Sequence, residues 1–140
     1  LLTREALDLY LSRVSDNGVV VLHLSNRNLA IVSEAARVAR DLGAPTLYRL
    51  SNQFELPGVA LYGGSAASAM IVARDPATLA ALPLVNDDWR VLTAPPGRSW
   101  TDDYINVPRA LWDQLSGAET CWLFDYLEHC RPDEAAAETP

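Results

Sequence analysis

The sequence predicts an α/β domain built on a mostly parallel sheet whose last strand runs antiparallel. Helical and strand-like patterns alternate with short connections over residues 3–50, which is the element order of an α/β protein. Residues 19–24 (VVVLHL) form an almost unbroken apolar run, which is typical of a strand buried on both faces. A further strand-like run follows the second strand with no helical pattern between them, which favours antiparallel pairing of the two.

The first helix is expected over residues 4–14. Thr3 is a suitable N-cap, and Leu7 and Leu11 fall on one face at helical spacing. Turn-forming residues end the helix at 16–18, where Gly18 is expected to adopt the left-handed conformation of a C-terminal cap. The buried strand 19–24 follows, and polar residues 25–28 lie at its carboxyl end.

The remaining elements are read in the same way. A second helix is expected over 29–42, because Gly43 and Pro45 then stop it, and a second strand over 46–50. Residues 51–65 are polar and interrupted by Gly and Pro, and a third strand is expected over 69–73. A short helix begins at Asp75-Pro76. Two helical pieces broken at Gly117 are expected within 109–130.

The composition excludes several classes of function. The chain has 140 residues, a formal net charge of −7, and 11 basic residues that are all arginine. Without lysine it has no Walker-type phosphate site and no Schiff-base lysine. Its acidic balance is unsuited to nucleic-acid phosphates. Residues 132–140, rich in Glu, Ala and Pro, are expected to form an acidic flexible tail.

Three stretches of the chain resemble the spermidine synthase-like proteins, the aminopropyltransferase-type domains that include forms fused to a membrane transporter-like segment. The stretches are LLTREALDLYLSRVSDNGVVVLHLSNRNL (1–29), SAMIVARDPATLAAL (68–82) and WTDDY (100–104), within roughly residues 1–107. The sequence departs from the family's pattern in three places. Asn28 stands where an aromatic residue is usual, residues 16–18 replace Pro-Gly-Gly, and residues 105–107 replace Ser-Asn-Leu.

The resemblance implies the C-terminal half of a class I methyltransferase-like Rossmann sheet, occupying residues 1–107, followed by a helical extension (108–131) and the tail. A complete relative transfers an aminopropyl group from decarboxylated S-adenosylmethionine to a diamine. The glycine-rich turn and acidic ribose ligand of such cofactor sites have no counterpart here, and the family's catalytic aspartate lies upstream. We therefore expect no bound cofactor and no catalytic residue in this stretch alone, with transferase activity only if an upstream half completes it.

Two groups of polar residues are candidates for binding the amine substrate. They are Asp102, Asp103, Tyr104, Ser25, Asn26 and Arg27. The carboxylates of the first group complement ammonium groups. The second group follows a central strand, where ligands of open α/β sheets bind, and in the family this loop borders the amine site. The competing interpretations are structural: a loop cap or salt bridge at 102–103, and an N-cap for the following helix at Asn26 or Asn28.

Two other functions remain open at this point. The chain could be a non-catalytic module that pairs through an exposed strand edge, either with a second copy or with an N-terminal half or membrane segment. It could also be part of an S-adenosylmethionine-dependent methyltransferase. No metal site and no nucleic-acid partner are predicted. With neither a signal peptide nor a bilayer-spanning run, the expected location is the cytoplasm, including the cytoplasmic part of a membrane-anchored protein.

Overall fold

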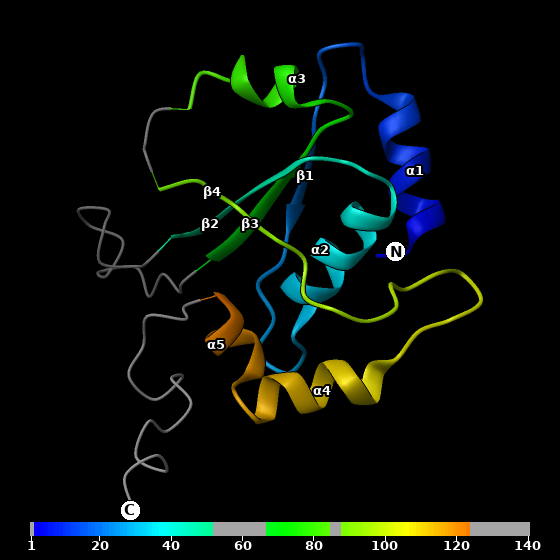
Figure 1. The fold of residues 1–140 in the computed structure, drawn as a ribbon, viewed down its shortest axis with the longest axis vertical. Helices are drawn as coiled ribbons and strands as arrows, with labels where there is room; N and C mark the ends of the chain where they lie inside the picture. Colours follow the sequence, from blue (N-terminus) through cyan, green and yellow to red (C-terminus); the bar gives the residue numbers. More distant parts are fainter. Residues whose placement is uncertain (1, 52–66, 85–87, 124–140) are drawn as a thin grey trace, which may run out of the picture.

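The computed structural model describes residues 2–51, 67–84 and 88–123. In chain order its elements are α1 (Arg4–Arg13), β1 (Val20–His23), α2 (Ile31–Asp41), β2 (Thr46–Ser51), β3 (Ala67–Val72), α3 (Pro76–Ala80), β4 (Arg90–Val91), α4 (Val107–Leu115) and α5 (Ala118–Leu123). Figure 1 shows α1 and α2 together beside the sheet, α3 at one end of the strands, and α4 and α5 at the other end.

In the described part of the chain the strands form one sheet in the order β1-β3-β2-β4, and every pairing is antiparallel. The predicted Rossmann-like sheet of parallel strands is therefore wrong. β1 and β2 point in the same direction, but they are not neighbours because β3 lies between them and pairs with both. The expected antiparallel pairing of the second and third strands is confirmed, with Thr46 opposite Val72 and Ser51 opposite Ala67.

β3 occupies the inside of the sheet because both of its faces are apolar. Met70 and Val72 belong to the buried cluster that includes α1 and α2, whereas Ile71 belongs to a second cluster that includes α3. β1 lies at the edge, and exposure alternates along it. The expectation that residues 19–24 are buried on both faces is wrong, since Val21 is 63% exposed. An unbroken apolar run does not by itself distinguish an inner strand from an edge strand.

The main hydrophobic core lies between the sheet and the pair α1 and α2. Leu7 and Leu11 of α1 are buried there, each contributing about 1.5–3 kcal/mol. Later segments join the same core: Trp100 and Ala110 are buried in it, and the Ala30 N–H donates to the Ala110 carbonyl at 2.9 Å. The region after residue 95 is thereby attached to α2, next to the loop that follows β1.

Several predicted helix ends are confirmed. The Thr3 side chain caps α1, and Asp75 caps α3 with Pro76 in its first turn. Gly117 separates α4 from α5 with a φ of 73°, a conformation that glycine adopts readily. The prediction for Gly18 is wrong, because this residue does not have a positive φ. A Cβ at Gly18 would lie only 2.9 Å from that of Val14, so glycine is required there by close approach.

Parts of the sequence-based expectations fall outside the described residues. They include most of the polar segment 51–65, the end of the helical extension after 123, and the tail 132–140.

β4 is a short strand that no sequence pattern indicated. Of the helices in the described ranges, none combines the length and the apolar character needed to cross a membrane.

Candidate functional site

The candidate site is a polar cavity of about 390 Å³ at the end of the sheet that faces α5. We call it the polar cavity. The loop after β1 contributes Ser25, Asn26 and Arg27, so the predicted second group of binding residues lies together in its lining. Leu24, directly after β1, also lines the cavity. The other lining residues come from α2, β2, β3, α4 and α5 and are Val32, Tyr48, Leu50, Ser68, Gln114, Glu119, Thr120 and Leu123. Its volume lies within the range of about 300–1,000 Å³ found for small-molecule sites.

The loop after β1 is held by its own side chains. The Ser25 Oγ accepts a hydrogen bond from the Ser68 N–H at 2.8 Å, which extends the β1–β3 pairing by one contact. The Asn26 Oδ1 accepts from the N–H groups of Asn28 and Leu29 at 2.8 and 3.0 Å. Asn26 therefore closes a turn two residues before α2 begins, and the expected capping of the helix itself is wrong. This turn fixes the orientation of the loop at the cavity.

Tyr48 of β2 supplies a hydroxyl to the polar cavity. Its side chain is buried, and its hydroxyl shares a hydrogen bond with the Ser68 Oγ at 3.2 Å. Burial raises the pKa of the Tyr48 phenol, partly opposed by the bond to Ser68. The phenol is therefore protonated at neutral pH and can donate one hydrogen bond and accept others.

Glu119 brings a carboxylate to the polar cavity from α5. Its Oε1 accepts from the Ser33 N–H in the first turn of α2 at 2.7 Å. α2 needs this contact because its N-cap residue, Ala30, has no side chain that can cap. Burial raises the pKa of the Glu119 carboxyl, with the hydrogen bonds from Ser33 acting in the opposite direction. A ligand cation beside Glu119 would favour its charged form.

The sequence did not single out Glu119 as a functional residue. The available signal was indirect: Leu29 and Ala30, the two residues directly before α2, have no side chain that can cap. A helix without a local cap needs an acceptor for its first N–H groups from elsewhere in the chain. Finding which acidic residue provides it required the position of α5.

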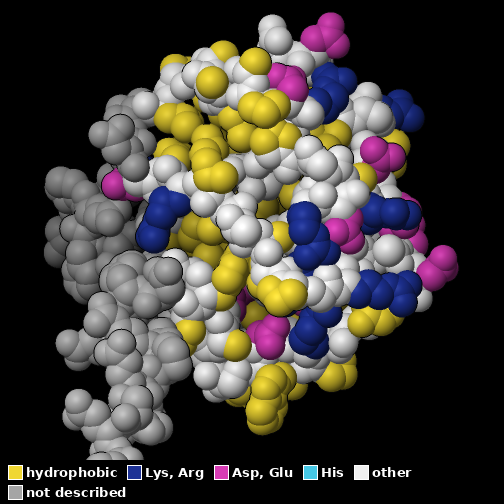
Figure 2. All heavy atoms as spheres, in the orientation of Figure 1, with side chains coloured by type: hydrophobic (Ala, Val, Ile, Leu, Met, Phe, Trp, Pro, Cys, Tyr) yellow, Lys and Arg dark blue, Asp and Glu magenta, His cyan; other side chains and the backbone are white. Residues whose placement is uncertain are grey.

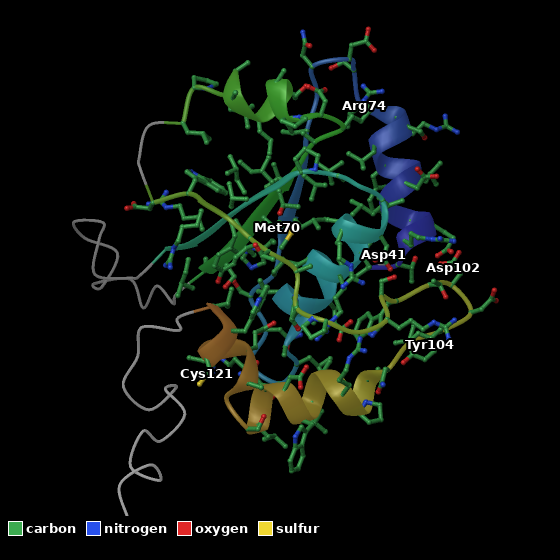
Figure 3. The ribbon with its side chains drawn as sticks, viewed as in Figure 1. Asp41, Met70, Arg74, Asp102, Tyr104 and Cys121 are labelled. Atoms are coloured by element: carbon green, nitrogen blue, oxygen red, sulfur yellow. The ribbon has the colours of Figure 1, made fainter. Side chains whose placement is uncertain are left out.

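The structure places the first group, 102–104, in another part of the molecule. Asp102 accepts from the Thr3 Oγ1 at 2.7 Å, and its N–H donates to Glu5 at 3.0 Å. Asp102 thus contacts the start of α1, and no residue of 102–104 belongs to the lining of the polar cavity. Figure 3 shows Asp102 near the start of α1 and Tyr104 on the segment that leads to α4, both away from Cys121 on α5.

The Tyr104 side chain contacts residues close to it in the sequence. The Arg98 guanidinium lies 4.0 Å from the centre of its ring, a cation–π contact, and its hydroxyl accepts from the Asn106 Nδ2 at 3.3 Å. Asp103 is exposed. The structure thus brings residues 25–27 together with Glu119, and it does not bring them together with residues 102–104.

A buried charge cluster joins α2 to α4. Glu34, fully buried, accepts from the Arg37 Nη1 at 2.8 Å and from the Arg109 Nε and Nη2 at 3.0 and 2.8 Å. Arg37 also donates to the Pro96 carbonyl, and Arg109 to the Arg98 carbonyl. Burial lowers the pKa of the Arg37 guanidinium. Because these groups are bonded to one another, we assign the cluster to structure rather than to binding.

Within the described ranges, no group of three or more His, Cys, Asp or Glu side chains is placed to hold a metal ion. Comparison with protein-family models, with curated proteins and with solved structures gives no match for this chain.

Proposed function

We propose that the chain forms the amine-binding part of a spermidine synthase-like transferase domain. The observation that carries the proposal is the meeting of the loop 25–27 with the carboxylate of Glu119 in one cavity of about 390 Å³. The resemblance of residues 1–29 and 100–104 to that family supports the substrate class. In this proposal Glu119 takes the role for which the sequence suggested Asp102 and Asp103.

The chemistry of the lining suits a linear diamine or polyamine. An ammonium group requires anionic or oxygen acceptors, which Glu119, Tyr48 and Ser68 supply. The methylene chain between two ammonium groups requires apolar walls, which Leu24 and Leu123 supply among others. Arg27 lies at the same cavity, so one ammonium group of the ligand is expected to lie beside Glu119 and the other away from this guanidinium.

The reaction of a complete relative sets a limit on what this chain does. The amine nitrogen forms a bond to the aminopropyl carbon of decarboxylated S-adenosylmethionine, the carbon–sulfur bond breaks, and the amine proton passes to a base. The sequence has no glycine-rich turn of the cofactor-binding type. We therefore propose that this chain binds amine but neither binds the sulfonium co-substrate tightly nor transfers the aminopropyl group alone.

Isothermal titration calorimetry with spermidine at neutral pH tests the proposal. Glu119→Gln keeps a hydrogen-bond acceptor for Ser33 and removes the charge, and we expect it to weaken binding about tenfold or more, or about 1.4 kcal/mol. Asp8→Asn makes the same charge change on an exposed residue of α1 and should leave binding unchanged. Absence of spermidine binding to the wild type, or equal binding by Glu119→Gln, would contradict the proposal. Tight binding of decarboxylated S-adenosylmethionine would contradict the limit stated above.

The open edge of β1 favours a second candidate function, a module that pairs with a second copy of this chain. The Leu24 N–H donates to the Ser68 carbonyl, so the alternation of an antiparallel ladder directs the backbone groups of Val21 and His23 away from β3. In the described part of the chain β1 is an edge strand, with no strand paired on the side that faces away from β3. An unpaired edge of this kind is a template for another strand.

Light scattering tests this second candidate directly. We expect a dimer or larger species for the wild type and a monomer for Val21→Lys, because a lysine on an edge strand opposes pairing. Asp8→Lys places the same side chain on α1 and should not change the mass. A wild-type monomer at micromolar concentration contradicts the pairing function but leaves amine binding untouched.

A further inference from the structure

A second cavity, which we call the apolar cavity, lies between α2, the start of β2, α3 and the segment that begins at β4. Its volume is about 570 Å³. Five alanines from these elements line it, together with Leu47 and Leu79 among other residues: Ala36, Ala39, Ala44, Ala80 and Ala94. Figure 2 shows hydrophobic side chains gathered around a hollow below α3, the helix at the top of Figure 1. None of its lining residues belongs to the polar cavity.

The sequence explains why this space is not filled. α2 lines the cavity with two alanines beside Arg40, and α3 with Ala80 beside Pro76 and Leu79. The alanines leave room that leucines would occupy. β4 pairs with β2 through only two residues. The sheet therefore ends early on this side, next to the α2 residues that line the cavity.

The charge of the lining selects the class of ligand. Arg40 is the one ionisable residue among the lining residues described, and its donors are already used. Its Nη1 donates to the Pro95 carbonyl at 3.1 Å, its Nη2 to the Gly97 carbonyl at 2.9 Å, and its Nε to Asp41 at 2.8 Å. Each guanidinium nitrogen of Arg40 thus already donates to a protein acceptor, and the lining offers a ligand no other charged partner.

We propose that the apolar cavity binds a neutral, apolar small molecule. Cavities lined by hydrocarbon exclude water and accept apolar ligands of matching size, and the volume lies within the range of about 300–1,000 Å³ typical of small-molecule sites. The apolar surface that such a ligand covers is removed from water, which favours binding. This site goes beyond the amine site, since it needs neither Glu119 nor the loop after β1.

N-phenyl-1-naphthylamine, a neutral dye that fluoresces in apolar surroundings, tests the proposal on the full 140-residue chain. We expect saturable binding of one dye per chain. Ala80→Trp places a large side chain at the exposed wall of the cavity and should weaken binding about tenfold or more. Ala77→Trp makes the same change on the same helix outside the lining and should not weaken it. No saturable binding, or equal effects of the two variants, would overturn the proposal.

Alanine-methyl NMR of the wild type gives a readout that does not depend on a variant folding. On addition of the dye, the methyl signals of Ala36, Ala44 and Ala94 should shift, whereas that of Ala6 on α1 should not. If only the methyl signals of other alanines shifted, the assignment of the dye site to the apolar cavity would be wrong. Shifts of the same cavity methyls with protein concentration, in the absence of dye, overturn the small-molecule assignment in favour of a second copy of this chain.

Discussion

Replacing Glu34 by Gln should cost the protein a large part of its stability. Glu34 has 0% exposure and accepts hydrogen bonds from both Arg37 and Arg109. Removing one partner of a buried ion pair costs about 3–5 kcal/mol. Two features place the expected cost at the lower end of this range. The Arg109 side chain is 22% exposed, so water still solvates its charge, and Asp113 remains 3.9 Å from the Arg37 Nη2 as a second anionic partner. We expect a loss of about 3 kcal/mol and a fall in Tm of about 10 °C.

Urea unfolding followed by tryptophan fluorescence measures this loss. The exposed substitution Asp8→Asn is the control and should change the free energy of unfolding by less than about 0.5 kcal/mol. Replacing Glu34, Arg37 and Arg109 together by apolar residues should cost less than the single change, because no buried charge is then left without its partner. A loss below about 1 kcal/mol for Glu34→Gln would refute the reasoning. A loss that small is what removing a solvent-exposed ion pair costs, so burial of the cluster would then have no effect.

Three further predictions concern single side chains. Because the folded-state pKa of Glu119 is raised above 4.5, the folded protein binds this proton more tightly than the unfolded chain. The free energy of unfolding of the wild type should therefore fall relative to that of Glu119→Gln as pH rises above about 4.5. If urea unfolding gave the two proteins the same pH dependence of this free energy, the prediction would be contradicted. Ser99→Ala removes the 2.6 Å hydrogen bond that most lowers the pKa of Asp41, so NMR titration should show this pKa rising, and an unchanged value would refute the assignment. Asp75→Ala removes the cap on Thr78 and should cost about 1 kcal/mol in urea unfolding, whereas no loss would mean that α3 is held by packing alone.

The ends of the elements could be predicted because their signals are local. Thr3 and Asp75 each cap a helix through a neighbour three residues away, and Gly117 interrupts one through its own φ. Strand partners follow no such signal. The apolar run at 19–24 indicated a strand but not that its neighbour would be β3, because an apolar sequence fits any adjacent strand that buries it.

The candidate site also has one part that the sequence predicted and another that it did not. The polar loop 25–27 was predicted because it directly follows a strand, and the structure places it at a cavity. Glu119 and Glu34 were not predicted, since their partners lie 86 and 75 residues away in Ser33 and Arg109. Contacts over such separations depend on how the helices pack, and this information is spread over the whole core.

The insertion of β3 between two earlier strands has a consequence for how the chain folds. β2 reaches β3 across a connection that starts at Ser51 and ends at Ala67, whereas Val20 of β1 pairs with Val72. Closing the shorter loop costs less chain entropy, so the β2–β3 hairpin should form first and β1 should join last. During synthesis β1 also emerges long before its partner, with apolar side chains and backbone groups still unpaired. The order of the strands in the sheet thus makes β1, which precedes β2 and β3 in the chain, the last of the three to be paired.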